Sequence, residues 1–343
     1  MKIALFVAAM PFIRGGTEVL VESLKDQLDK RGHMTKIFRL PLIDDHETGI
    51  FLSALSCQLL DFSDYDVLIS FKWPTYLAVH KQKVIWMFHQ FRQVYDLFGT
   101  PYGIINDNTG KAIREMVIQT DRAALGNAGN LFALSNAAKR LKEYLGISAD
   151  ILYTPLGSEE DYHYSSTGDF IYCASRIDCI KRQFLAVEAM LYVKSEAKLV
   201  LDGKCSDDRL LDEMRTYINK HGLGDKVKIS EKFVPEETKI ERYANCLAGI
   251  YLPLDEDSPG IVTLEVMYSR KTLITTSDSG GVADFVQHGD TAFVVEPTPQ
   301  AVAGKIDYLF NNKETARQMG ENAYKYVAGK NINWDDTIRR LLR

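Results

Sequence analysis

The 343-residue sequence lacks the features that mark several common classes of protein. Its five cysteines are an odd number and form no Cys-x-x-Cys pair, which argues against a disulfide framework or a zinc site and favours reduced thiols. No apolar run approaches the roughly 20 residues of a membrane-spanning helix. The net charge of −5 argues against a nucleic-acid partner. We therefore expect a cytoplasmic protein, and only a peripheral contact with the inner face of the cell membrane is compatible with this sequence.

A dinucleotide-binding fingerprint is missing as well. Gly-x-Gly-x-x-Gly does not occur, which argues against a nicotinamide-dependent dehydrogenase. The sequence shows no internal repeat and no low-complexity tract. Apolar residues make up 46% of the chain, and that share, over this length, predicts two domains of ordinary size.

Short apolar runs alternate with amphipathic stretches along the whole chain. Residues 1–9 form a nearly continuous apolar run, which is typical of a parallel strand covered on both faces. A helical pattern and a second strand at 34–40 follow, and this β-α-β pattern restarts after Pro155. Further strands are predicted at 67–70, 84–88, 131–134, 170–174, 197–201, 227–229, 249–252, 273–276 and 292–295. The alternation predicts an α/β fold with two Rossmann-like parallel-sheet domains, 1–155 and 156–330.

Two carboxylates stand eight positions apart in the second half, at Asp257 and Glu265, with a Pro-Gly break between them. A helix that begins at Gly260 would present free backbone N–H groups and its positive dipole end to an anion, typically a phosphate. The two carboxylates could then hold neutral hydroxyl groups. A phosphate together with hydroxyls indicates a sugar nucleotide.

This segment resembles the Glu-x7-Glu signature of retaining glycosyltransferases with the GT-B fold. They belong to the large family four, which includes lipopolysaccharide and polysaccharide transferases. Asp257 stands where that family more often has Glu. The expected strand at 271–276 and the glycine pair Gly280-Gly281 follow in the family's order. The resemblance implies two domains facing across a cleft, with the last helix, about 331–343, packing back on the first domain.

Two cations follow the first strand of the second half, at Arg176 and Lys181. They resemble the family's Gly-Arg-x4-Lys segment, with Ser175 in place of the usual Gly. Departure of a nucleoside diphosphate concentrates negative charge on its β-phosphate, which Arg and Lys can offset without a metal ion. We therefore expect no metal and no cofactor, because the nucleotide sugar is a co-substrate.

Two features of the first half match the family by position. Gly15 and Gly16 lie at the first strand-to-helix turn, where glycine lets the backbone approach a bound group closely. His89 ends a predicted strand, and the carboxyl ends of parallel strands are where α/β sheets bind ligands. The resemblance places the glycines near the donor phosphates and His89 near the transferred sugar. Arg92 and Tyr95 are assigned to the acceptor side.

The resemblance also implies roles for individual residues. Glu265 would hold the ribose hydroxyls of the nucleotide, and Asp257 a hydroxyl of the sugar. The remaining substrate contacts would come from backbone groups, at Gly260, Ile261 and Val262 for the sugar or phosphate and at Phe233 and Val234 for the base. Alanine at Lys181 or Glu265 is then expected to abolish most transfer while leaving the fold intact.

Several functions stay open at this point. The leading hypothesis is a retaining, metal-independent hexosyltransferase that moves a sugar from a nucleotide-diphosphate sugar to a glycan or lipid-linked acceptor. The alternatives are a sugar-nucleotide epimerase or hydrolase on the same fold and a non-catalytic binding homologue. Residues 255–257 also form an Asp-x-Asp sequence, a motif that binds a metal ion in proteins of the other large glycosyltransferase fold. Here the motif leads directly into the helix of Glu265, and we therefore interpret it as a segment that does not bind metal.

Overall fold

The computed structural model describes residues 1–9, 16–43, 47–205, 207–232 and 234–343. The chain divides into two compact units. The first unit comprises Met1–Thr154 and Asn333–Arg343, and the second unit comprises Pro155–Ile332. The unit boundary thus lies at 154/155, beside the predicted boundary at 155/156.

The first unit is built on a six-stranded parallel sheet in the order β2-β1-β3-β4-β5-β6. The chain order reverses between β1 and β3, as in doubly wound sheets. Its elements are β1 (Lys2–Ala9), α1 (Gly16–Lys30), β2 (Met34–Pro41), α2 (Glu47–Leu59), β3 (Val67–Lys72), η1 (Thr75–Leu77), β4 (Lys83–His89), η2 (Arg92–Val94), α3 (Asn108–Gly126), β5 (Asn130–Ala133), α4 (Ser135–Leu145), β6 (Asp150–Ile151) and α12 (Trp334–Leu341).

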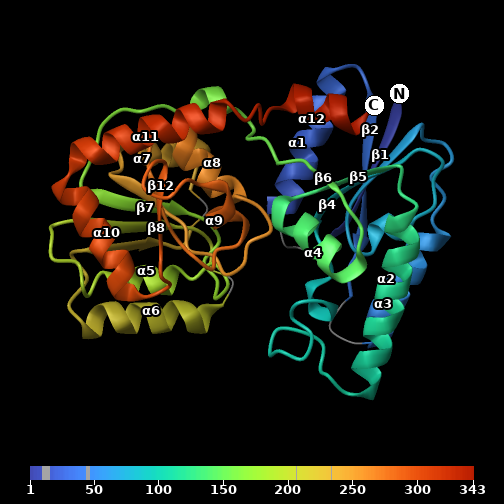
Figure 1. Ribbon diagram of the computed structural model, residues 1–343, viewed down its shortest axis with the longest axis horizontal. Coiled ribbons are helices and arrows are strands. Elements are labelled where there is room, and N and C mark those ends of the chain that lie inside the picture. Colours follow the sequence, from blue (N-terminus) through green and yellow to red (C-terminus); the bar gives the residue numbers. More distant parts are fainter. Residues whose placement is uncertain (10–15, 44–46, 206, 233) are drawn as a thin grey trace. The chain divides into compact units, whose positions relative to one another are not determined.

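The second unit contains a second six-stranded parallel sheet, in the order β12-β11-β10-β7-β8-β9. Helices cover both of its faces, with α5 and α6 below the sheet and α7, α8 and α11 above it in Figure 1. Its elements are η3 (Glu159–Asp161), β7 (Phe170–Ala174), α5 (Gln183–Ala189), β8 (Lys198–Asp202), α6 (Asp208–Lys220), β9 (Val227–Ser230), α7 (Glu236–Asn245), β10 (Ala248–Ile250), α8 (Gly260–Tyr268), β11 (Leu273–Thr276), α9 (Gly281–Phe285), β12 (Ala292–Val295), α10 (Pro299–Asn311) and α11 (Lys313–Ala328).

Apart from β6, the strands form where the apolar runs predicted them, because each sheet is covered on both faces and strand positions are therefore mostly apolar. In β1, all residues from Ile3 to Ala9 are buried. The C-terminal helix α12 belongs to the first unit, and its Trp334, Ile338 and Leu341 side chains are buried in that unit's hydrophobic core. The α/β fold class predicted from the sequence is confirmed.

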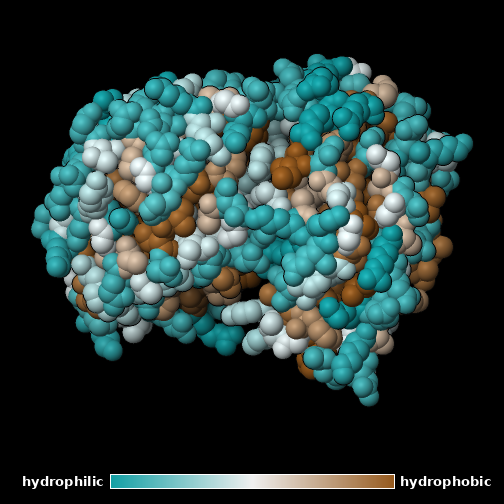
Figure 2. Space-filling view, in the orientation of Figure 1, coloured by the Kyte–Doolittle hydropathy of each residue, from teal (hydrophilic) through white to brown (hydrophobic). Residues whose placement is uncertain are grey.

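One helix of the first unit turns large apolar side chains outward. On α2, the exposed side chains include Phe51, Leu52, Leu55 and Leu59. Figure 2 shows hydrophobic atoms at the edge of the first unit beside α2. Within the described ranges, no helix combines the length and apolar character that crossing a membrane requires.

Candidate functional site

The second unit has a topological switch point, where strands are added on opposite sides of the first strand. β8 and β9 follow β7 on one side, and β10 lies on its other side. In open α/β sheets, ligands bind outside the carboxyl ends of the strands at such a point. The loop after β7 carries Arg176 and Lys181, and the loop after β10 leads to Gly260 and α8. The fold therefore brings together two motifs that are more than 70 residues apart in sequence. We call Arg176, Lys181, Glu256 and the N-terminus of α8 the switch-point site.

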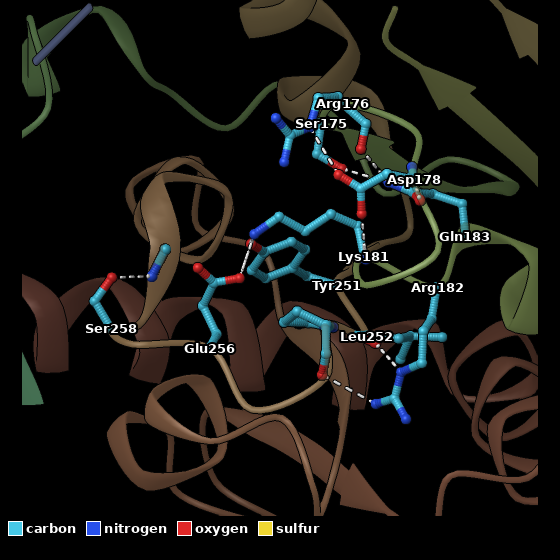
Figure 3. Close-up of polar contacts among 12 residues, drawn as sticks. Ser175, Arg176, Asp178, Lys181, Arg182, Gln183, Tyr251, Leu252, Glu256 and Ser258 are labelled. Atoms are coloured by element: carbon cyan, nitrogen blue, oxygen red, sulfur yellow. Dashed lines mark hydrogen bonds and ion pairs between the residues drawn. The ribbon is translucent and has the colours of Figure 1, made fainter. Parts of the chain in front are cut away.

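Lys181 reaches from the β7 loop to the β10 loop. Its Nζ lies 2.8 Å from the Tyr251 hydroxyl and forms an ion pair with Glu256, whose carboxylate also accepts a hydrogen bond of 3.0 Å from Tyr251. Figure 3 shows the Lys181 side chain extended toward these two residues. Its side chain is 19% exposed, so an anion that binds here must share or replace Glu256.

Arg176 is more open to solvent. Its side chain is 56% exposed, and its Nε donates a hydrogen bond of 2.7 Å to Asp178 Oδ2. The other oxygen of Asp178 accepts a 2.8 Å bond from the backbone N–H of Lys181. Asp178 therefore orients one cation and fixes the backbone of the other. Asp178 was not among the residues predicted from the sequence, although it lies between the two cations in the same loop.

The N-terminus of α8 requires glycine at its first position. Gly260 has φ +73°, and a Cβ there would lie 2.8 Å from Cε1 of the Tyr251 ring. The Gly260 N–H donates to the Ser258 hydroxyl over 3.1 Å, so one of the three backbone groups predicted to meet a substrate already has a protein partner. Ile261 and Val262 occupy the next positions of the first helical turn.

Replacing Gly260 with alanine is expected to destabilise the second unit by about 2–5 kcal/mol. The left-handed backbone costs an L-residue roughly 1–2 kcal/mol, and overpacking against Tyr251 adds about 1–3 kcal/mol. Gly289→Ala is the matched control, because Gly289 has φ +81° but an added Cβ would meet no atom within 4 Å. Chemical denaturation measures both free energies of unfolding. Equal losses in the two variants would contradict the packing argument.

The acidic run before α8 is held by the glycine pair after β11. Asp255 has φ +47°, and the Gly281 N–H donates 2.7 Å to the Glu256 carbonyl. A Cβ on Gly280 would lie 2.7 Å from backbone atoms of Glu256. This close backbone approach explains why glycines occur there. Asp257 is half-buried in the same loop.

Glu265 lies in a separate buried cluster of the second unit. Its Oε1 accepts a 3.2 Å bond from the Tyr162 hydroxyl and lies 2.5 Å from Lys239 Nζ on α7. Lys239 also forms an ion pair of 2.9 Å with Glu236. Burial raises the pKa of the Glu265 carboxyl, and the Lys239 ammonium acts in the opposite direction. We call Tyr162, Glu236, Lys239 and Glu265 the Glu265 cluster.

The two Glu265 carboxylate oxygens differ in their surroundings. The hydrogen bonds that the described residues give this carboxylate all reach Oε1. The side chain is only 3% exposed. A hydroxyl group that approaches Oε2 would therefore meet a carboxylate whose orientation is already fixed from the other side.

Arg182, beside Lys181, is structural. Its guanidinium donates to the Leu252 carbonyl over 2.7 Å and to both oxygens of Asp278, also over 2.7 Å. It therefore ties the β10 loop to the β11 loop and keeps the backbone next to Lys181 in place. The sequence alone could not separate these two adjacent cations by role.

The first unit holds the remaining predicted residues. His89 ends β4, and its Nδ1 donates a 2.8 Å hydrogen bond to the Gln90 carbonyl. Burial lowers the pKa of His89 to about 4, with Lys72 and Arg92 acting in the same direction. The ring is therefore neutral at pH 7, and Nε2 is its acceptor nitrogen.

The structure describes only some of the residues predicted to form the glycine loop and the base contacts. Gly16 is the first residue of α1, and an added Cβ there would meet no atom within 4 Å. Val234 is half-buried before α7. Gly15 and Phe233 lie outside the described residues. In the described ranges, no group of three or more His, Cys, Asp and Glu side chains is placed to hold a metal ion.

The geometry thus defines an α/β protein with two cationic side chains and a helix N-terminus at a sheet switch point. Residues 158–326 match the model of the family "Glycosyl transferases group 1". The matched residues lie within the second unit. It is 31% identical over 120 residues to the alpha-1,3/1,6-mannosyltransferase ALG2 of Dictyostelium discoideum, a match that covers 35% of this chain and 28% of that protein. The chain spans only 28–50% of the curated relatives it matches.

Solved structures share the fold over nearly the whole chain. Sucrose-phosphate synthase from Thermosynechococcus elongatus has a TM-score of 0.75 at 16% identity, covering 98% of this chain and 96% of that one. Anabaena HepE, solved in complex with UDP and glucose, has a TM-score of 0.70 at 12% identity, covering 98% and 97%. The fold is that of the GT-B glycosyltransferases, as the sequence predicted.

Proposed function

We propose that this protein transfers a sugar from a nucleotide-diphosphate sugar to a hydroxyl group of a glycan or glycolipid. The observation that carries the proposal is the meeting of Arg176, Lys181 and the N-terminus of α8 at one switch point. A guanidinium, an ammonium and a helix N-terminus together suit a diphosphate. The family match over the second unit and the UDP bound to HepE support a nucleotide donor.

In this proposal, each side chain has a distinct task. Arg176 and Lys181 offset the charge that develops on the leaving diphosphate, in place of a metal ion. Glu265 accepts hydrogen bonds from the ribose hydroxyls, and Asp257 from a hydroxyl of the sugar. The Glu256 carboxylate, which now pairs with Lys181, gives way to the phosphate.

The transfer proceeds with retention of the anomeric configuration. The acceptor hydroxyl attacks the face that the diphosphate leaves, so that one C–O bond forms as the bond to the phosphate oxygen breaks. The leaving phosphate takes the acceptor's proton, and no protein nucleophile is needed. His89, neutral at pH 7 because burial lowers its pKa, accepts a hydrogen bond from a sugar hydroxyl at Nε2.

Backbone groups complete the donor site in this proposal. Gly16, Ile261 and Val262 meet the phosphates or the sugar, and the backbone at Val234 meets the base. The acceptor is a growing polysaccharide or lipopolysaccharide at the inner face of the cell membrane. The exposed apolar side chains of α2 are suited to a peripheral contact there.

The test is release of nucleoside diphosphate from UDP-, GDP- and ADP-sugars, with and without glycan acceptors and with EDTA. Acceptor-dependent release that EDTA does not affect, with a product of retained configuration by NMR, is expected. Release that needs no acceptor would indicate a hydrolase or epimerase instead. Nucleotide binding without any release would indicate a non-catalytic homologue, and inhibition by EDTA would contradict the metal-free mechanism.

A further inference from the structure

Cationic side chains gather around His89 at the carboxyl edge of the first unit's sheet. Lys72 ends β3 and is the register partner of His89 at the end of β4. Arg92 lies in η2, three residues after His89, and Arg140 lies on α4. All three shift the pKa of the His89 ring downward, the direction expected of nearby positive charge. The switch-point site and the Glu265 cluster lie in the other unit, so this cationic cluster is a separate feature.

Two of these cations meet at one carboxylate. Arg92 Nη2 lies 2.6 Å from Asp96 Oδ2, and Arg140 Nε lies 3.8 Å from the same oxygen. The Arg140 side chain is only 6% exposed. Two guanidinium groups at one largely buried carboxylate oxygen make a further anion electrostatically favourable nearby.

The N-terminus of α4 lies beside this cluster. α4 begins at Ser135, directly after Leu134, whose N–H donates 3.1 Å to the Met87 carbonyl in β4. Leu134 cannot cap the helix through its side chain. The Ser135 hydroxyl is buried without a hydrogen-bond partner among the described residues. A helix start with an uncommitted hydroxyl supplies donors for an oxyanion.

A second buried polar group at this edge lacks partners. The Gln90 side chain, next to His89, is fully buried, and neither its amide oxygen nor its nitrogen has a hydrogen-bond partner within the described part of the chain. Such groups are rare in proteins and call for a missing partner. The edge thus combines cations with two buried polar side chains that no described residue satisfies.

We propose that the acceptor carries a phosphate group and that Lys72, Arg92, Arg140 and Ser135 bind it. This inference rests on the proposed function, because only a transferase has an acceptor. Arg binds phosphate through two parallel N–H groups, and Lys adds a point charge. The phosphate can belong to a soluble sugar phosphate or to a lipid headgroup, since the chemistry of recognition is the same.

Binding is measured by calorimetry on the full chain, with inorganic phosphate, glycerol 3-phosphate and glycerol as probes. Vesicles of phosphatidylcholine with and without phosphatidic acid test the lipid source by co-sedimentation. Wild type is expected to bind the phosphate probes and not glycerol. Lys72→Gln and Arg140→Gln are each expected to weaken binding by about tenfold or more, because a hydrogen bond to a charged group is lost. Arg140→Lys keeps the positive charge but loses the two parallel N–H donors of the guanidinium, so it should weaken phosphate binding less than Arg140→Gln.

Controls separate this site from the donor site. Arg122→Gln removes an exposed cation of the same unit and should leave binding unchanged. Lys181→Ala should keep phosphate binding at the first unit. No binding of any phosphate probe, equal binding of glycerol, or loss only in Lys181→Ala would overturn the proposal. Thermal stabilisation by UDP reports on the donor site independently of phosphate binding, and Lys72→Gln should keep it. If UDP stabilises neither wild type nor any variant, the result contradicts the proposed function instead.

Discussion

Replacing Lys181 with alanine is expected to reduce sugar transfer by about 10²- to 10³-fold, the usual cost of removing one donor to a developing negative charge. The loss should appear in kcat, because the charge on the diphosphate is greatest in the transition state. Stability should change little, since the Glu256 carboxylate left behind is 21% exposed and can be hydrated. Steady-state kinetics and thermal unfolding measure the two effects.

Glu256→Gln is the informative companion to this variant. It removes the negative charge that pairs with Lys181 while keeping the size of the side chain. If the ion pair competes with the substrate, this variant should bind the nucleotide at least as tightly as wild type. Arg209→Ala, which removes a cation that is 92% exposed, controls for the change in net charge. Wild-type kcat in Lys181→Ala would contradict the assignment of Lys181.

Glu265→Ala is expected to lower the free energy of unfolding of the second unit and to abolish transfer. Glu265 and Lys239 form a buried ion pair, and removal of one partner from such a pair costs about 3–5 kcal/mol. The sequence alone predicted an intact fold, because it did not show that Lys239 depends on this carboxylate. Glu265→Gln keeps the shape and a hydrogen-bond acceptor for Lys239, so it should lose less stability.

A double-mutant cycle separates stability from function at this position. Lys239→Met removes the buried ammonium, and the combination with Glu265→Gln should recover part of the stability lost in Glu265→Gln alone. Transfer should stay low in the double variant, because the carboxylate proposed to hold the ribose hydroxyls is still missing. Recovery of transfer together with stability would show that Glu265 acts only through folding.

The fold could be predicted from the sequence because a strand that is buried on both faces has apolar residues at nearly every position. β6 was missed, since Asp150–Ile151 is a two-residue strand with no run of its own. The switch-point motifs were also visible, because Arg176, Lys181 and Gly260 follow strands directly. Their meeting depends on strand order, which puts β10 beside β7.

The partners of the site residues could not be read in the same way. Glu256 is the middle acid of three, and it pairs with Lys181, which lies 75 positions earlier in the sequence. Lys239 lies 26 positions before Glu265 in the sequence, so the spacing of residues along a helix could not predict that the two side chains pair. Such long-range pairs follow from tertiary packing.

The most direct test of the central claim, an anion site for a nucleotide diphosphate at the switch point, is thermal unfolding with UDP, GDP, ADP and CMP. Each nucleotide is added with and without EDTA, to wild type and to Arg176→Ala. A ligand at about 100 times its Kd adds roughly 2.7 kcal/mol to the folded state. We expect stabilisation by one nucleoside diphosphate that EDTA does not remove and that Arg176→Ala loses. Stabilisation by none of the four, or only in the presence of metal, would contradict the account.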